Sequence, residues 1–191
     1  PGDTTRPVTD RVKVSLFNIL GDCVPEARFL DLFAGTGGVG IEALSRGAAQ
    51  AVFVERDERA LATIRRNLEL TRLGDLAQVV RRDVFKFLEA YRGEAFDIVY
   101  VAPPQYKELW SRTLRLLDGL QVVAESGLVV AQIHPREYED IELLHLELTD
   151  QRKYGSTMLC FYEVRPGIRP SAPTTPECAV SSGSQPSAEA R

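Results

Sequence analysis

Several features that mark particular protein classes are scarce in this chain of 191 residues. It holds three cysteines and two histidines, and the cysteines are widely spaced, with neither a CxxC pair nor a cluster beside a histidine. We therefore expect a reduced intracellular protein with no bound metal. No apolar run approaches the roughly 20 residues of a membrane span, and no signal-peptide pattern opens the chain, so no membrane partner is expected.

A surplus of positive charge is missing as well. The formal net charge is −4, whereas a protein that neutralises several phosphates usually shows a basic patch or stripe. This balance argues against a nucleic-acid partner, although net charge averages over all faces of a molecule. Because the first residue is Pro1, we expect the natural start to lie upstream, where a basic or targeting segment could precede it.

The rest of the composition is that of an ordinary globular domain. Hydrophobic residues make up 44% of the chain and charged residues 26%, and the length suits one α/β core but not a cofactor domain with a separate substrate domain. After position 164, Pro, Ser, Thr and Ala dominate and hydrophobic periodicity ends, so residues 165–191 are expected to form a disordered tail. One domain over 1–164 should therefore carry all functions.

Within that domain, hydrophobic runs of strand length alternate with segments of helical period, as in parallel strands joined by crossover helices. Strands are predicted at 29–33, 51–55, 77–82, 96–101, 128–133, 141–149 and 157–164. Helices are predicted at about 9–20, with Thr9 as N-cap, and at 39–46, 58–73, 84–91 and 107–117. Val12, Leu16, Ile19 and Leu20 are expected on the buried face of the first helix.

The last two predicted strands differ from the others because only DQRKYGS joins them. Such a short link forbids a parallel crossover and permits an antiparallel hairpin. Leu144, Leu146 and Leu148 alternate with polar residues, so the hairpin should have one wet face. The predicted fold is therefore α/β and Rossmann-like, with a mostly parallel seven-stranded sheet, a C-terminal antiparallel hairpin and helices on both faces.

The strongest local signal is FLDLFAGTGGVG, in which Gly35, Gly37 and Gly40 fit the G-x-G-x-x-G pattern between a strand and a helix. Glycine permits a tight turn and close backbone approach, and the helix N-terminus offers unpaired N–H groups to a ligand. Glu55 follows at the tip of the second strand, where it could accept hydrogen bonds from both hydroxyls of a ribose. These features fit NAD and S-adenosylmethionine equally well.

Two further acids favour S-adenosylmethionine. Asp31 lies near the end of the first strand, where it would repel a pyrophosphate but attract the ammonium of a methionine moiety. Asp83 ends the third strand, where it could accept from an adenine amine while Val84 offers its backbone N–H. Arg56 completes the predicted cofactor contacts. In the plainer alternatives, Asp31 pairs with Arg56 or a loop amide, Asp83 caps the next helix, and Glu55 is a solvated strand end.

The fourth strand ends in FDIVYVAPPQY, which supplies the candidate catalytic residues. Adjacent prolines cannot continue a ladder, which leaves the Pro103 carbonyl free to face a substrate. Tyr106 could stack on a flipped base. Methyl transfer to a planar exocyclic amine needs acceptors for its N–H groups, an aromatic wall and alignment, so we assign these roles to Ala102, Pro103, Pro104 and Tyr106.

The APPQY loop is similar to the [DN]PPY motif of amino-group methyltransferases. Together with TRPVTDRVKVSLFNIL, LDLFAGTGGVGIEALSRGA, FVERD and KYGSTML, it resembles the RsmD family of small-subunit rRNA guanine-N2 methyltransferases, in order over nearly all of residues 3–164. The resemblance implies a class I methyltransferase fold and S-adenosylmethionine as donor. It places donor contacts at Asp31, Gly35, Gly37, Glu55 and Asp83, and the base at the APPQY loop.

The resemblance also implies partners and a location. The substrate would be a guanine of bacterial small-subunit ribosomal RNA, in an assembling small ribosomal subunit. The enzyme would act as a monomer in the bacterial cytoplasm, or in an organelle if a targeting segment precedes Pro1. RNA contacts are predicted at Arg6, Arg11 and Tyr154, with a plain capped amphipathic helix and a hairpin turn as the alternatives.

The sequence departs from the family pattern on the substrate side. Ala102 stands where most members carry Asp or Asn, and Gln105 moves the aromatic residue by one position. Val14 stands where the family commonly has an acid, and the usual basic strand ahead of PGDTTRP is missing. These departures keep a binder of RNA or of a protein partner, without methyl transfer, as an alternative. An NAD-dependent oxidoreductase is a further alternative, against which Asp31, Asp83 and the paired prolines argue.

Overall fold

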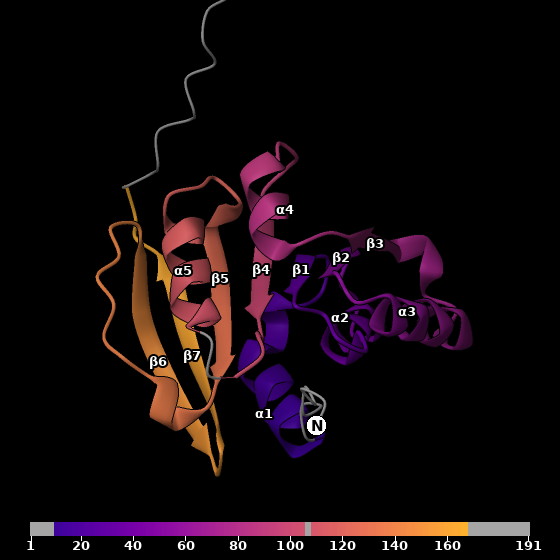
Figure 1. The fold of residues 1–191 in the computed structure, drawn as a ribbon, viewed down its shortest axis with the longest axis horizontal. Coiled ribbons are helices and arrows are strands. Elements are labelled where there is room, and N and C mark those ends of the chain that lie inside the picture. Colours follow the sequence, from indigo (N-terminus) through magenta and orange to yellow (C-terminus); the bar gives the residue numbers. More distant parts are fainter. Residues whose placement is uncertain (1–9, 106–107, 168–191) are drawn as a thin grey trace, which may run out of the picture.

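The structure, a computed structural model, describes residues 10–105 and 108–167. Its strands are β1 (Arg28–Leu32), β2 (Gln50–Glu55), β3 (Ala77–Arg81), β4 (Phe96–Val101), β5 (Val123–Ile133), β6 (Leu146–Tyr154) and β7 (Thr157–Val164). They form one sheet in the order β3-β2-β1-β4-β5-β7-β6 (Figure 1). The first five strands pair in parallel, and β7 is antiparallel to both β5 and β6.

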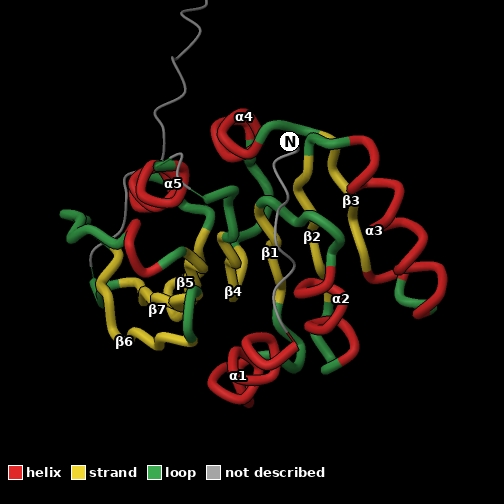
Figure 2. The backbone as a smooth tube through the Cα atoms, turned by 60° about the horizontal axis from the view of Figure 1, so that its bottom comes forward, coloured by secondary structure: helices red, strands yellow, loops and turns green. Residues whose placement is uncertain are grey.

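Helices cover both faces of this sheet (Figure 2). The α-helices are α1 (Asp10–Leu20), α2 (Gly38–Ser45), α3 (Glu58–Thr71), α4 (Val84–Ala90) and α5 (Leu109–Asp118), and the 3-10 helices are η1 (Gly21–Cys23), η2 (Gly74–Leu76) and η3 (Pro135–Glu137). One buried cluster joins α1, α2 and α3 to the sheet, and a second joins α4 and α5 to the opposite face. The predicted architecture is therefore confirmed.

The central strands form because their side chains are apolar on both faces. In β1 and β4, successive residues alternate between the two buried clusters, as a parallel sheet with two helical layers requires. Helix α3 turns Leu61, Ile64 and Leu68 toward the core, at a helical spacing. Its N-cap is Asp57, whose Oδ1 accepts from the Ala60 N–H at 2.9 Å.

The sheet positions a site at its switch point. Strand β1 lies between β2 and β4, so the connections after β1 and after β4 lead to opposite faces. The carboxyl ends of β1, β2 and β4 meet there, and open parallel sheets bind ligands in the crevice that such a reversal leaves.

Most of the predicted helices and strands begin and end within two residues of the observed ones. Strand β6 is the largest departure from the predicted elements, since it begins at Leu146 instead of position 141 and continues to Tyr154. The segment taken as a link is thus mostly strand, and the turn is made at Gly155, which has φ 61°. The predicted inward row was wrong for Leu144 and Leu148, which are 73% and 37% exposed. A register shift in the β6–β7 pairing between Leu148 and Asp150 breaks the alternation.

Three other expectations are corrected or left open. Ile19 is 40% exposed, because α1 packs through Val12, Leu16, Phe17 and Leu20. Strand β5 starts at Val123, before the predicted position 128, with a register shift against β4. The predicted cap Thr9 and most of the predicted tail lie outside the described residues. No helix in the described part of the chain is long and apolar enough to cross a membrane.

Candidate functional site

The glycine turn between β1 and α2 is held in a conformation that ordinary residues rarely adopt. Phe33, Gly35 and Gly37 have φ values of 60°, 55° and 76°. The Gly37 N–H donates to the Ala34 carbonyl at 2.8 Å, and Ala34 donates in turn to Val54 of β2 at 3.1 Å. A positive φ is uncommon at a residue with a side chain such as Phe33, so the turn is tightly constrained by its surroundings.

Asp31 lies directly under this turn and is 2% exposed. Its Oδ2 accepts from the Gly40 N–H at 3.0 Å, so the predicted loop-amide alternative is part of the geometry, whereas no described contact joins Asp31 to Arg56. Burial raises the pKa of Asp31 to about 8; the Gly40 bond opposes this rise and the nearby charge of Glu55 adds to it. A cation beside Asp31 would restore the charged carboxylate.

Gly40 permits the close approach that this bond requires. A Cβ at position 40 would overlap the ring of Phe53 and lie 3.2 Å from Asp31 Oδ2. The absence of a side chain at residue 40 lets the first turn of α2 lie this close to β1 and β2. The third glycine of the predicted motif thus serves helix–strand packing, and the first two shape the turn.

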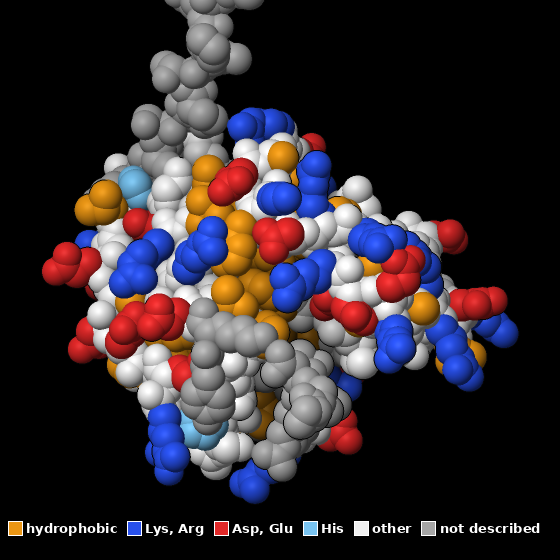
Figure 3. All heavy atoms as spheres, viewed as in Figure 1, with side chains coloured by type: hydrophobic (Ala, Val, Ile, Leu, Met, Phe, Trp, Pro, Cys, Tyr) orange, Lys and Arg blue, Asp and Glu red, His pale blue; other side chains and the backbone are white. Residues whose placement is uncertain are grey.

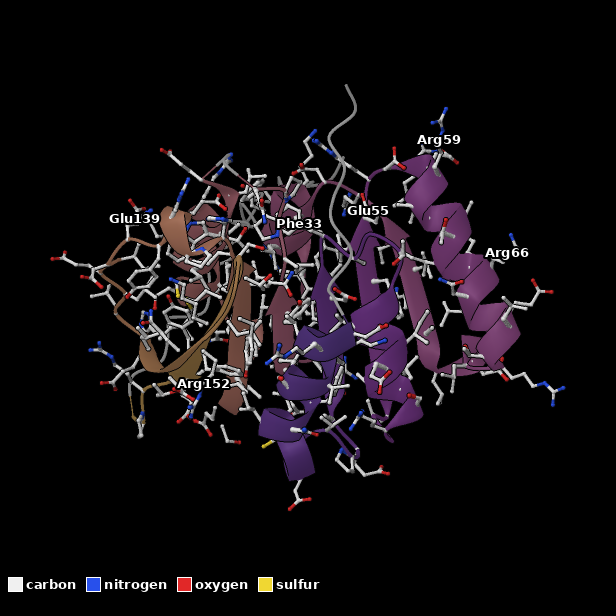
Figure 4. The ribbon with its side chains drawn as sticks, turned by 90° about the horizontal axis from the view of Figure 1, so that it is seen from below. Phe33, Glu55, Arg59, Arg66, Glu139 and Arg152 are labelled. Carbon is white, nitrogen blue, oxygen red and sulfur yellow. The ribbon has the colours of Figure 1, made fainter. Side chains whose placement is uncertain are left out.

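Glu55 ties the tip of β2 to the turn. Its Oε2 accepts from the Gly35 N–H at 2.9 Å, and its Oε1 accepts from the N–H groups of Arg56 at 2.8 Å and Asp57 at 2.9 Å. A carboxylate has about four acceptor positions, so about one remains for a ligand hydroxyl. Figure 4 shows Glu55 and Phe33 at the same end of the sheet, where Glu55 ends β2 and Phe33 follows the last residue of β1.

Asp83 is the N-cap of α4, which confirms the alternative prediction that it caps the next helix. Its Oδ1 accepts from the N–H groups of Phe85 at 3.1 Å and Lys86 at 3.3 Å. Both bonds use the same oxygen, so capping leaves Oδ2 available for a ligand amine. Val84 is buried in the first turn of α4, and the Arg56 side chain is exposed beside Glu55. Arg56 thus follows β2, and Asp83 and Val84 follow β3, at the edge of the sheet where β1 ends.

The candidate catalytic loop follows β4 at the same edge of the sheet. The Ala102 N–H donates to the Leu32 carbonyl of β1 at 3.4 Å, and Ala102, Pro103 and Pro104 are half-buried. The loop therefore begins next to the end of β1, close to the glycine turn. Tyr106 lies outside the described residues, so its predicted stacking role stays a prediction.

Sequence reasoning missed a polar pair beneath this loop. The Tyr100 hydroxyl of β4 donates to Oε1 of Gln132 in β5 at 2.6 Å, and Tyr100 is 2% exposed. Tyr100 pairs in register with Asp31. The alternation of side chains along β4 would have placed Tyr100 and Ala102 on one face of the sheet, but it could not have identified Gln132 as the partner.

Two of the predicted RNA contacts lie within the described residues. Arg11 is exposed on α1, and Tyr154 is half-buried at the hairpin turn, packed against the cluster beneath α1 and α2. Arg6 lies outside the described residues. On the face in Figure 3, Lys and Arg side chains are interspersed with acidic ones around a central apolar area, so this face carries no stripe of one sign.

A cavity of about 250 Å³ lies at the opposite end of the sheet and is separate from this site. It is lined in part by Asp118, His145 and Leu146, near the amino ends of β4 and β5. The Asp118 carboxylate accepts from three backbone N–H groups there, each at 2.8 Å. Among the described residues, no group of three or more His, Cys, Asp or Glu could hold a metal ion.

A family model described as conserved hypothetical protein 95 matches residues 1–163 of the chain. The chain belongs to this family. The RsmD family expected from the sequence is thereby confirmed. A candidate rRNA methyltransferase of Bacillus subtilis, YlbH, is 41% identical over 86% of this chain and 90% of its own length.

Two further relatives come from Escherichia coli. The ribosomal RNA small subunit methyltransferase D of strain K12 is 39% identical over 66% of this chain and 63% of that protein. The solved structure of the candidate methyltransferase yhhF is 32% identical and has a TM-score of 0.76. The match covers 85% of this chain and 89% of that one. The class I methyltransferase fold is therefore shared by this RsmD-family chain.

Proposed function

We propose that this RsmD-family protein transfers a methyl group from S-adenosylmethionine to the exocyclic N2 amine of a guanine in small-subunit ribosomal RNA. The observation that carries the proposal is the buried Asp31 under a glycine turn, next to Glu55. Relatives named as rRNA methyltransferases support the rRNA substrate. The assembling small subunit, the bacterial cytoplasm and a monomeric enzyme are parts of the same proposal.

The residues of the cradle fit this donor. S-adenosylmethionine supplies an electrophilic methyl group on a sulfonium and presents an ammonium, a ribose and an adenine. Asp31 would hold the ammonium, because a nearby cation offsets the cost of its buried charge. The remaining acceptor position of Glu55 suits one ribose hydroxyl, and Oδ2 of Asp83 suits the adenine amine.

The loop after β4 would hold the acceptor base. A carbonyl of Ala102 or Pro103 can accept from one N–H group of an exocyclic amine, and the two prolines restrict the movement of those carbonyls. In the transfer, the amine nitrogen forms a bond to the methyl carbon, the carbon–sulfur bond breaks, and the amine loses a proton to solvent. The contribution of the protein is alignment and electrostatics without a covalent intermediate.

One observation favours a second candidate, a binder of RNA without transfer activity. Ala102 has no side-chain acceptor at the position where most members of the family carry Asp or Asn. Such a protein would still bind S-adenosylmethionine but would not transfer its methyl group. An oxidoreductase is disfavoured, because Asp31 lies where the pyrophosphate of NAD would bind.

Titration calorimetry and radiolabelled methyl transfer together test the proposal. The protein is expected to bind S-adenosylhomocysteine and not NAD, and to transfer label to unmodified small-subunit rRNA or to immature small subunits. Mapping of the methyl group should locate it on N2 of a guanine. Donor binding without transfer to either substrate would favour the binder, and NAD binding without S-adenosylhomocysteine binding would overturn the donor assignment.

A further inference from the structure

Ala102 leaves a gap in the chemistry of the proposed site. An exocyclic amine that attacks a methyl group needs an acceptor that fixes its orientation. The methyl side chain of alanine cannot accept a hydrogen bond. A backbone carbonyl of the loop can hold one N–H group of the amine, which leaves the second N–H group for a side-chain acceptor at the level of residue 102. A polar side chain from a neighbouring strand could reach this level.

The register of the sheet places Gln132 beside Ala102. In the parallel pairing of β4 with β5, Tyr100 lies opposite Val130 and Val101 lies opposite Ala131. The next positions along the two strands are therefore Ala102 and Gln132. Parallel neighbours at the same level send their side chains to the same face of the sheet. A side chain from position 132 thus projects next to the space above Ala102.

The same face carries the donor acid. Tyr100 is the register partner of Asp31, and residues two apart in a strand share a face, so Tyr100 and Ala102 both point toward the side where Asp31 lies. Val130 shares a buried cluster with Tyr100, and Ala102 packs against that cluster. Gln132 follows Val130 by two positions and faces the same way. Asp31 and Gln132 thus flank β4 on one face.

A hydrogen bond fixes the amide of Gln132. The Tyr100 hydroxyl donates to Gln132 Oε1 at 2.6 Å. Burial, together with the charge of Asp31, raises the pKa of Tyr100 well above its usual range, so the hydroxyl keeps its proton and remains a donor. An amide oxygen has two acceptor positions and an amide nitrogen has two N–H groups, so the side chain retains capacity for a ligand after this bond is made.

We propose that the Gln132 side chain provides the acceptor that Ala102 lacks and orients the amine of the guanine for methylation. The inference rests on the proposed function. Oε1 would accept from the N2 amine, and the amide N–H would donate to the neighbouring ring nitrogen N3, so the carboxamide matches the N2/N3 edge of guanine. A neutral amide takes up no proton, and the proton released by the amine goes to solvent. Tyr100 acts as a positioning residue for Gln132.

The test compares four variants of the full chain in single-turnover methyl transfer and in S-adenosylhomocysteine binding. Gln132→Ala is expected to slow transfer about 30-fold and to leave donor affinity within about twofold, because alignment of the amine is lost while the donor cradle is intact. Addition of Ala102→Asp to Gln132→Ala should restore most of the rate. Gln132→Met keeps the length of the side chain without an acceptor and should slow transfer as much as Gln132→Ala. Gln78→Ala, at an exposed position of β3, is the matched control and should change neither quantity.

The outcomes separate this inference from the proposed function. Wild-type protein that methylates no RNA would overturn both. Full transfer by Gln132→Ala would overturn the inference and leave the proposed function standing. A rate loss that Ala102→Asp does not rescue, or that comes with an equal loss of donor affinity, would mean that Gln132 only supports the fold and would likewise overturn the inference. If the alanine variant does not fold, Gln132→Met, which keeps the bulk of the side chain, decides the test: transfer at the wild-type rate would overturn the inference.

Discussion

Two buried aspartates in this chain have opposite surroundings. Asp118, at the end of α5, is 7% exposed and accepts from the backbone N–H groups of Leu144, His145 and Leu146, each at 2.8 Å. Asp31, near the end of β1, is 2% exposed, and its one hydrogen bond within the described residues comes from the Gly40 N–H at 3.0 Å. The same side chain accepts three backbone N–H groups in one place and one in the other.

This difference separates a structural acid from a functional one. A buried carboxylate that accepts several backbone N–H groups is stabilised within the fold. A buried carboxylate with few partners carries an electrostatic cost, which appears here as the pKa of Asp31 raised to about 8. Burial alone would not have told the two apart. The number of filled acceptor positions does: Asp118 holds the approach to β6, and the unfilled positions of Asp31 support its proposed role as a donor contact.

The largest expected effect is on stability, from Asp118→Ala. The change leaves three buried or half-buried backbone N–H groups of the β6 approach without their acceptor, so the free energy of unfolding should fall by about 3–4 kcal/mol. Thermal unfolding should show a midpoint lower by roughly 10 °C. Affinity for S-adenosylhomocysteine should stay the same, since Asp118 lies at the other end of the sheet. A loss of donor affinity in protein that is still folded would contradict the comparison.

The reciprocal change is Asp31→Asn, with Asp118→Ala as its control. The amide has nearly the shape of the protonated acid, so unfolding stability at pH 7 should change by less than about 1 kcal/mol. Affinity for S-adenosylhomocysteine should fall about 100-fold, because a charge-assisted contact to the ammonium is lost. Calorimetric titration and thermal unfolding of the same samples give both values. Unchanged affinity would remove Asp31 from the donor site.

The sequence predicted those helices and strands whose bounds depend on residues close to one another in the chain. The strands of the parallel sheet and the helix with Leu61, Ile64 and Leu68 could be recognised because periodicity and stop signals lie within a few residues of each other. The start of β6 could not be recognised in this way. It is set by Asp118, whose carboxylate binds backbone groups 26 to 28 positions further along the chain. No window of neighbouring residues contains that information.

The candidate site divides in the same way. The spacing of Asp31, the glycines and Glu55 follows from one strand–turn–helix–strand unit, so the position of these residues at one edge of the sheet was predictable from the sequence. The pair of Tyr100 with Gln132 spans two strands, and its hydrogen bond joins positions 32 apart. It depends on the register of β4 against β5, which hydrophobic patterns leave undetermined when both strands are buried on both faces.

A smaller effect is expected where the donor side depends on close packing. In Gly40→Ala, the new Cβ would meet the ring of Phe53 and press on Asp31 Oδ2. Stability should fall by about 2 kcal/mol, and donor affinity should fall with it as α2 shifts away from Asp31. The control is Gly38→Ala, whose Cβ would meet only Thr36 Oγ1 at 3.8 Å. Equal behaviour of the two variants would show that the approach of α2 to β1 is not tight.

The smallest effect, and the one most specific to Asp31, is the pH dependence of ligand affinity. Its pKa of about 8 in the folded protein lies above the ordinary value of 3.8, so the folded state holds a proton that the unfolded state has lost between these pH values. The contribution of Asp31 to stability therefore falls as pH rises from 4 to 8. Ligand binding should shift the same titration. An ammonium ligand favours the ionised carboxylate of Asp31, so binding at pH 7 should release close to one proton. Affinity for S-adenosylhomocysteine should accordingly rise by up to about tenfold from pH 6.5 to 7.5, below the pH at which an α-amino group itself titrates. Calorimetry in buffers of different ionisation enthalpy measures the released proton directly, and Asp31→Asn should abolish the release. Release that persists in the Asn variant would assign the titration to another group and leave Asp31 no different from Asp118.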